Sequence, residues 1–302
     1  MSACEDEHRV HFRSQVPSLD GTHYKGQAGR IAVIGGSEEY TGAPFFSAMS
    51  AMRGGADLSF VFCPRNAAQI IKSYSPDLIV YPGFDALGNE CTALARMHAI
   101  VVGPGLGRTD HAAEVFEKVL SYAIRSGTVL VIDADALWFL SQSPNLFAEI
   151  ANSAEGFHVY LTPNKVELDR LLIAAAVDST VQLVKLLKGK AVIIAKGNKD
   201  VIVSLNVQAE ISTKASQKRV GGQGDILSGL LALYAFWMLR SRPLPCGPGY
   251  GVDGCLVTAA VAACSITRDA TYQAFLKHRH GFVASDALAF VAEAVSKYVS
   301  DG

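Results

Sequence analysis

The sequence lacks several features that would place it in a common class of protein. Its 302 residues carry 27 Lys and Arg against 28 Asp and Glu, so there is no charge excess to attract a polyanion. The longest apolar stretches, Gly229 to Leu239 and Cys255 to Ile266, are shorter than the roughly 18 residues that a membrane span needs. The start, Met1 to Glu7, is acidic, unlike a secretory signal or a transit peptide. We therefore expect a cytosolic protein with no nucleic-acid or membrane partner.

Paired cysteines and familiar catalytic motifs are also missing. The six cysteines are scattered without a C-x-x-C pair, which argues against a structural zinc site and predicts reduced thiols in the core. The P-loop pattern G-x-x-x-x-G-K-[ST] does not occur, which argues against a P-loop enzyme. No Ser-His-Asp or Cys-His set can be assembled either, so the common hydrolase classes have no support.

What is present is a repeated alternation of short apolar runs and helical segments. Hydrophobic residues make up 50% of the chain, enough for a large core. Several runs are apolar on both faces, as in parallel strands covered by helices on each side. The fold class predicted is a three-layer α/β/α sandwich with a mainly parallel central sheet. The expected strands are Arg30 to Gly35, Asp57 to Phe62, Leu78 to Tyr81, Ala99 to Gly103, Thr128 to Asp133, His158 to Thr162 and Ala191 to Lys196.

The remainder of the chain predicts antiparallel edge strands and then helices alone. Asp200 to Leu205 and Val207 to Ser212 form an expected hairpin at one edge of the sheet. After Gly224 we expect three helices and an exposed loop from Arg240 to Gly251. We expect a flexible tail over residues 1–13 and a single catalytic domain over 14–302. The expected helices are Asp225 to Leu239, Val252 to Arg268 and Ser285 to Val299.

Glycine and polar residues follow the predicted strands. Ligands of open parallel sheets bind beyond the carboxyl ends of the strands, so these residues are expected to meet at one rim. Glycine suits a phosphate site, because it lets backbone amides approach closely, but each segment is also compatible with a simple tight turn. The segments begin at Gly35, Gly103, Asp133, Thr162 and Lys196.

A second glycine cluster, Gly221 to Gly224, leads directly into an apolar helix that begins at Asp225. Free backbone amides and the helix dipole at such a start can hold a phosphoryl group. Asp225 could then accept the proton of an attacking hydroxyl group. The alternative is an aspartate that merely caps the helix, which taken alone is at least as common.

Asn164 and Glu167 have the N-x-x-E spacing of a helix capping box. The same oxygens could orient Mg²⁺ through water molecules, because Mg²⁺ prefers oxygen ligands and keeps part of its hydration shell. The sequence favours neither interpretation over the other.

Taken in order, these segments resemble those of the ATP- or ADP-dependent NAD(P)H-hydrate dehydratases, in the ribokinase-like superfamily. Gly222-Gln223-Gly224-Asp225 is similar to the G-x-G-D anion-hole signature of that superfamily. The resemblance spans residues 14 to 298. The other matching segments, in chain order, are Gly26-Gln27-Ala28-Gly29-Arg30, Gly35-Gly36-Ser37 with Tyr40-Thr41-Gly42-Ala43-Pro44, Gly103-Pro104-Gly105-Leu106-Gly107-Arg108, Asp133-Ala134-Asp135-Ala136-Leu137, Leu161-Thr162-Pro163-Asn164-Lys165-Val166-Glu167 and Lys196-Gly197.

The resemblance implies a metabolite-repair lyase that converts the (6S) hydrates of NADH and NADPH, NADHX and NADPHX, back to the intact dinucleotides. It implies ATP as phosphoryl donor, with Mg²⁺, because Gln223 resembles the eukaryotic ATP-using branch of the family. An epimerase acting on the hydrates is expected to be a separate protein, and homo-oligomer formation is left open.

By the same resemblance, Asp225 would act on the hydrate hydroxyl and other residues would bind the two substrates. Glu167 is the candidate for Mg²⁺ through water. The hydrate-binding residues would be Gly105, Asn164, Lys165, Val166, Glu167, Leu168, Asp169, Arg170 and Asp225. The residues binding the phosphates of ATP would be Lys196, Gly197, Asn198, Lys199, Asp200, Ala215, Ser216, Gln217, Lys218, Arg219, Val220, Gly221, Gly222, Gln223 and Gly224.

Two features depart from the family pattern. The family's His-Lys-Gly appears here as His23-Tyr24-Lys25-Gly26, and the loop from Arg240 to Gly251 is long. Two other functions use the same elements. One is a small-molecule kinase of the hydroxymethylpyrimidine or hydroxyethylthiazole type, which would release a phosphorylated product. The other is a nucleotide-binding module without catalysis.

Overall fold

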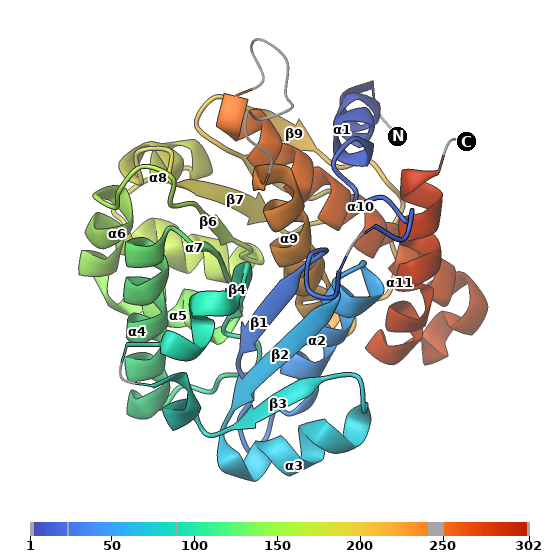
Figure 1. Ribbon diagram of the computed structural model, residues 1–302. Coiled ribbons are helices and arrows are strands. Elements are labelled where there is room, and N and C mark those ends of the chain that lie inside the picture. The colour runs from blue at the N-terminus through green and yellow to red at the C-terminus, as the bar shows by residue number, and fades with distance from the viewer. Residues whose placement is uncertain (1–2, 23, 89, 241–250, 301–302) are drawn as a thin grey trace.

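The structure is a computed structural model that describes residues 3–22, 24–88, 90–240 and 251–300. Its central layer is a nine-stranded sheet with the order β3-β2-β1-β4-β5-β6-β7-β8-β9 (Figure 1). The first seven strands run parallel, and β8 and β9 add an antiparallel hairpin at one edge. The strands are β1 (Arg30–Ile34), β2 (Leu58–Cys63), β3 (Ile79–Pro82), β4 (Ala99–Val102), β5 (Val129–Ile132), β6 (Val159–Leu161), β7 (Ala191–Ala195), β8 (Val201–Val203) and β9 (Gln208–Glu210).

Helices cover both faces of the sheet and complete the three predicted layers. One face is covered by α1 (Ala3–Arg13), α2 (Gly42–Arg53), α3 (Arg65–Tyr74), α9 (Gln223–Leu239), α10 (Gly251–His278) and α11 (Ala284–Val299). The other face is covered by α4 (Asp110–Ser126), α5 (Asp135–Gln142), α6 (Pro144–Ala151), α7 (Lys165–Ala174) and α8 (Thr180–Leu186). Three short 3₁₀ helices are η1 (Phe84–Leu87), η2 (Thr92–Arg96) and η3 (Arg279–Gly281).

Each parallel strand contributes to two cores, because successive side chains point to opposite faces. In β1, Ile31 and Val33 pack under α2 and α9, whereas Ala32 and Ile34 pack toward α4 and α5. This burial on both faces explains the continuous apolar runs. A sheet with one solvent-exposed face would instead alternate apolar and polar residues. The expected strands and the edge hairpin are thus confirmed, with ends that differ by one to a few residues.

Two expectations about helices are wrong. Residues 3–13 are not a loose tail, because α1 is a helix that packs along α10 and α11. Phe12 is fully buried there, with its ring 4.7 Å from that of Tyr234 and 5.7 Å from that of Tyr298. The helix α10 also continues to His278, beyond its expected end at Arg268. In both cases tertiary contacts bury a charged side chain, Glu5 in α1 and Arg268 in α10.

The cysteines and the longest helix also need correction. Cys63, Cys91 and Cys264 are buried free thiols, as expected, but Cys255 is disulfide-bonded. By length and composition, the helical stretch Gly251–Gly281 is apolar enough to cross a membrane, although 83% of its most apolar window is buried inside the protein. That burial is typical of a central core helix.

We predict that Phe12→Ala lowers the free energy of unfolding by about 3–5 kcal/mol, because it removes a buried ring from between α9 and α11. Urea denaturation would measure the change. The control is Val10→Ala on the same helix, since Val10 is 64% exposed. Equal effects of the two substitutions would contradict the packing of α1.

Candidate active site

The candidate site lies where the direction of strand addition reverses. From β1 the chain adds β2 and β3 on one side, and then crosses to add β4 on the other. At this switch point the loops after β1 and β4 are joined, because the Gly36 amide donates a hydrogen bond of 2.9 Å to the Pro104 carbonyl oxygen. A side chain at Gly35 would place its Cβ 2.2 Å from that oxygen, so only glycine fits there. Open α/β sheets bind ligands at such a crevice.

A cavity of about 910 Å³ occupies this crevice. Gly105 and Asp225, expected to contact one substrate, both line it, together with Gly221 and Gly222 from the start of α9. A second cavity of about 490 Å³ shares Pro64, Phe84 and His111 with the first. The two cavities are therefore adjacent along this rim. Other lining residues of the larger cavity follow β1, β4 and β5: Ser37, Glu38, Glu39, Tyr40, Leu106, Gly107, Arg108, Thr109, Ala134 and Asp135.

Next to this cavity, one ammonium group is surrounded by carboxylates. Lys196, directly after β7, places Nζ 3.0 Å from Asp133 Oδ1 and 3.9 Å from Glu167 Oε2. Asp133 is 1% exposed and also accepts a hydrogen bond of 2.8 Å from the buried Thr162 hydroxyl. A Cβ at Gly224 would lie 3.2 Å from Nζ, so glycine lets the helix start come close to Lys196.

Burial and the uneven charge balance shift the pKa values of this cluster. Burial and the charge of Asp133 raise the pKa of Asp225 to about 8, although Lys196 opposes the shift. Burial also raises the pKa of Glu167. Burial alone would lower the pKa of Lys196, but the carboxylates of Asp133 and Glu167 raise it. Such displaced values mark groups suited to acid–base chemistry or to binding a cation.

The Asp225 side chain does not act as a helix cap. Gly222, in the left-handed conformation with φ of 97°, occupies the cap position of α9, and no side chain caps that end. Among the described residues, the Asp225 carboxylate has no hydrogen-bond partner, whereas its carbonyl oxygen accepts one from Ser228. The Asp225 carboxylate is half-buried at the wall of the cavity, where it is open to a ligand.

The segment from Asn164 to Arg170 forms the start of α7. Its capping box is present, since Asn164 accepts from the Glu167 amide and Glu167 accepts from the Asn164 amide. Asn164, Lys165 and Val166 are exposed, while Leu168 packs against the core. Glu167 therefore reaches the Lys196 cluster while it also caps the helix, and capping and ligand contact are compatible at this residue. None of the seven residues from Asn164 to Arg170 lines the larger cavity.

The two segments expected to bind ATP lie side by side. Arg219 Nη2 donates to the Gly197 carbonyl oxygen at 2.8 Å and to Asn198 Oδ1 at 3.3 Å. Within the second segment, the Ser216 hydroxyl pairs with the Lys218 backbone, and Gln223 Nε2 donates to the Lys218 carbonyl oxygen at 3.3 Å. Lys199 instead points to Glu210, with 2.6 Å between Nζ and Oε1.

Sequence reasoning assigned no individual role to Thr162 or to Arg268. Thr162 directly follows β6, and that position was a usable signal. Arg268 stands out in the sequence as a cation near the end of a long apolar run. Two features singled out from the sequence, His23 and the loop at 241–250, lie outside the described residues.

Solved structures share this arrangement of strands and helices. A ribokinase-like superfamily protein from Enterococcus faecalis is similar, with a TM-score of 0.77 and 18% identity, over 97% of this chain and 95% of that one. The ADP/ATP-dependent NAD(P)H-hydrate dehydratase from Bacillus subtilis, co-crystallised with ATP and Mg²⁺, gives a TM-score of 0.74 at 19% identity, over 96% and 97% of the two chains. The fold is therefore ribokinase-like, which defines the class of protein.

Sequence similarity narrows the class to a family. The profile of the NAD(P)H-hydrate dehydratases matches residues 31–292. The ATP-dependent (S)-NAD(P)H-hydrate dehydratase of Bos taurus is 42% identical over 295 residues, which cover 93% of this chain and 86% of that protein. The chain belongs to the NAD(P)H-hydrate dehydratase family.

We predict that Asp225→Asn stabilises the protein by an amount that grows with pH. The folded-state pKa of about 8 lies above the ordinary value of 3.8, so the unfolded chain loses this proton first as the pH rises. The carboxylate therefore costs stability increasingly between these two values, up to about 5 kcal/mol. Urea denaturation at pH 5 and pH 8 would show a larger gain at the higher pH.

Asp85→Asn is the control, because the hydrogen bond from Arg65 lowers the pKa of that exposed carboxylate. This variant should show no gain at high pH. An Asp225→Asn gain that is the same at both pH values would contradict the raised pKa.

Proposed function

We propose that this chain converts (6S)-NADHX and (6S)-NADPHX to NADH and NADPH while ATP is hydrolysed to ADP and phosphate. The observation that carries the proposal is the Asp225 carboxylate at the cavity wall, which has no hydrogen-bond partner among the described residues. The preceding residue, Gly224, lies against Lys196. Family membership supplies the reaction class, and Asp225 supplies a group that can act on a hydroxyl. Gln223 in the G-x-G-D element supports ATP as the donor.

In this proposal Asp225 orients the C6 hydroxyl of the hydrate and takes its proton as the oxygen bonds to the γ-phosphorus of ATP. The bond from that phosphorus to the bridging oxygen breaks, and ADP leaves. Backbone amides at the start of α9, with the helix dipole, stabilise the charge that develops on the transferred group. Lys196 lies close enough to Gly224 to add its charge there.

The second half of the proposed reaction restores the ring. Phosphorylation turns a poor leaving group into a good one, so the lone pair of the ring nitrogen can expel phosphate from C6. Loss of a proton from the neighbouring C5 carbon then gives the dihydropyridine. The balance is one hydrate and one ATP consumed for one NAD(P)H, one ADP and one phosphate.

The carboxylates near Lys196 fit a role for Mg²⁺. Asp133, Glu167 and Asp225 outnumber the single ammonium group of Lys196, and burial raises the pKa values of Glu167 and Asp225. A cation would offset this surplus. No group of three or more metal-ligating side chains occurs within the described parts of the chain, so Glu167 would hold Mg²⁺ through water, with the phosphates as direct ligands. When bound, Mg²⁺ neutralises phosphate charge.

Five further properties belong to the proposal. Residues 14–302 act as one catalytic domain, and α1 packs onto it. The substrate-binding residues are those assigned above from the resemblance, with Gly105 and Asp225 at the cavity. The protein works in the cytosol, paired in function with a separate epimerase, and it can form a homo-oligomer.

The deciding experiment mixes the protein with acid-prepared NADH hydrate, Mg²⁺ and either ATP or ADP. The near-ultraviolet absorbance of the dihydronicotinamide should rise only when nucleotide is present, and faster with ATP. A stable phosphorylated product with no such rise would favour the small-molecule kinase. Nucleotide binding without any release of phosphate would favour the non-catalytic module.

We predict that Asp225→Asn lowers kcat by at least about 10²–10⁴-fold, the range typical for loss of a general base. The KM for ATP should change by less than about threefold, since the amide keeps the shape of the carboxylate. Steady-state kinetics would measure both values. Asp77→Asn, which removes an exposed carboxylate in the loop before β3, is the control and should retain full turnover. Near-normal turnover of Asp225→Asn would remove this residue from the mechanism.

We also predict an acidic limb in the pH profile. Asp225 must be ionised to accept a proton, so kcat/KM for the hydrate should fall about tenfold per pH unit below a pKa of about 8. The profile at ATP concentrations below KM reports the free protein. A flat profile between pH 6 and pH 9 would show that no group with this pKa limits the reaction.

A further inference from the structure

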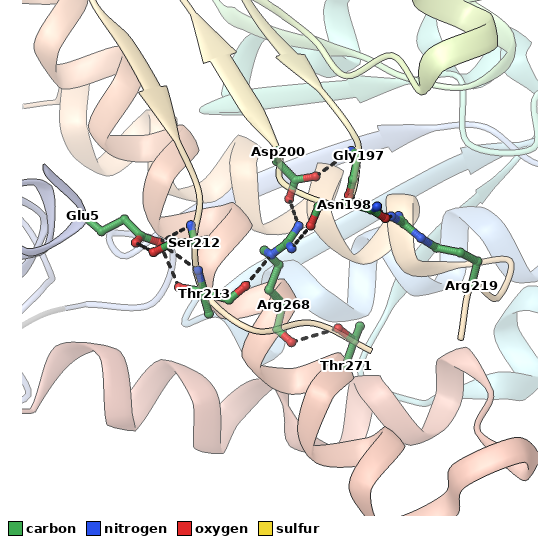
Figure 2. Close-up of polar contacts among 9 residues, drawn as sticks. All are labelled: Glu5, Gly197, Asn198, Asp200, Ser212, Thr213, Arg219, Arg268 and Thr271. Atoms are coloured by element: carbon green, nitrogen blue, oxygen red, sulfur yellow. Dashed lines mark hydrogen bonds and ion pairs between the residues drawn. The ribbon is translucent and has the colours of Figure 1, made fainter. Parts of the chain in front are cut away.

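The buried arginine of α10 reaches one of the segments proposed to bind ATP and the chain just before the other (Figure 2). Arg268 Nε donates a hydrogen bond of 2.7 Å to the Thr213 carbonyl oxygen. Its Nη1 forms an ion pair of 2.9 Å with Asp200 Oδ2, and its Nη2 donates to the Asn198 carbonyl oxygen. Arg268 is 9% exposed and Asp200 is 7% exposed. The planar guanidinium group thus joins two points of the backbone and one carboxylate from inside the protein.

The ion pair determines the shape of the loop after β7. Asp200 uses its other oxygen, Oδ1, to accept a hydrogen bond of 3.0 Å from the Gly197 amide. Arg268 holds the same loop at Asn198, and Arg219 holds it at Gly197 from the opposite segment. The loop from Lys196 to Asp200 is therefore fixed at each end by a charged side chain, and Arg268 supplies the buried one.

The N-terminal helix holds the chain just before the second segment. Glu5 of α1 is 1% exposed and accepts four hydrogen bonds, from the amide and hydroxyl groups of Ser212 and Thr213. Figure 2 shows that Thr213 lies between two charged side chains, with Glu5 on one side and Arg268 on the other. Thr213 comes two residues before the segment Ala215 to Gly224. Glu5 lies outside residues 31–292, the part matched by the family profile.

A role in stability alone would not require this arrangement. A buried ion pair is often no more stabilising than apolar residues of the same volume, because both charges must leave water. What the pair supplies is a defined geometry, since a guanidinium group bonds its acceptors only in fixed directions. The geometry that it defines here is that of two loops on either side of the proposed phosphate site.

We propose that Arg268 is a positioning residue for ATP. It acts together with Glu5, because both side chains bond Thr213. It fixes the loop Lys196 to Asp200 and, through Thr213, the chain that leads into the segment Ala215 to Gly224 at the spacing that the nucleotide requires. The inference rests on the proposed function. Arg268 does not line the cavity that holds Gly105 and Asp225, and its guanidinium group is engaged by Thr213, Asp200 and Asn198. We therefore expect it to contact neither the hydrate nor the reacting atoms. Its loss should weaken ATP binding and leave hydrate binding unchanged.

The test compares Arg268→Met and Arg268→Lys with the parent protein in steady-state kinetics and in calorimetric titration with ATP and Mg²⁺. Arg268→Met should raise both the KM and the Kd for ATP about tenfold or more, since misplacement by about 1 Å can cost a hundredfold. The KM for the hydrate should stay within about twofold. Arg268→Lys keeps the positive charge but loses the planar, forked donor group of arginine. Its KM and Kd for ATP should therefore lie between those of the parent protein and Arg268→Met.

Val261→Ala is the matched control, because Val261 is a fully buried residue of the same helix with no polar role. It should lower the melting temperature without raising the KM or Kd for ATP. An equal rise of these values in Val261→Ala would overturn the proposal, because general loosening of the fold would then explain the effect.

Glu5→Ala keeps the proposal testable if Arg268→Met does not fold. It should raise the Kd for ATP about threefold, through the freed Ser212 and Thr213, with the hydrate KM unchanged. Parent-like ATP affinity in folded Arg268→Lys and Glu5→Ala would overturn the positioning role while the parent protein still repairs the hydrate. A parent protein that binds ATP but repairs no hydrate would instead overturn the proposed function, and this inference with it.

Discussion

The ammonium group of Lys196 is the charge on which the arrangement of the rim depends. Asp133 follows β5, Glu167 begins α7 and Asp225 begins α9, and the charge of Lys196 offsets part of the repulsion among these carboxylates. Asp133, at 1% exposure, is the most buried and is satisfied by Lys196 and Thr162. Asp225 is left with a raised pKa and no hydrogen-bond partner among the described residues. The cluster thus keeps one carboxylate available for a reaction and supplies positive charge beside it.

Much of this site could be predicted from local patterns, because the fold turns sequence position into spatial position. In a parallel sheet the residue after each strand lies at the same rim, so Asp133 and Lys196 were expected to be neighbours before any contact was known. Gly105 and Asp225 were expected to meet because the family resemblance assigns both to the hydrate, and both line the larger cavity. What the pattern did not show was whether Asp225 caps its helix, since that depends on the cap geometry at Gly222.

Contacts between distant residues account for what sequence reasoning missed. Arg268 pairs with Asp200 across 68 positions, and Glu5 reaches Thr213 across 208, so no local periodicity reports either contact. The expected helix ended at Arg268, whereas Arg268 is buried in an ion pair with Asp200 and α10 continues for another ten residues. Glu5 and His8 gave the N-terminus the composition of a solvated tail, although both side chains are buried by partners elsewhere in the fold.

The central claim is that the hydroxyl oxygen of the hydrate attacks ATP, and the path of that oxygen tests it most directly. A hydrate carrying a heavy oxygen isotope at the C6 hydroxyl would be converted with ATP and Mg²⁺, and the inorganic phosphate would be analysed by mass spectrometry. If Asp225 activates the hydroxyl for phosphoryl transfer, the label must appear in phosphate, because the C6–O bond breaks after the O–P bond has formed. Label found only in water would show that ATP hydrolysis and dehydration are separate events, and would contradict the account.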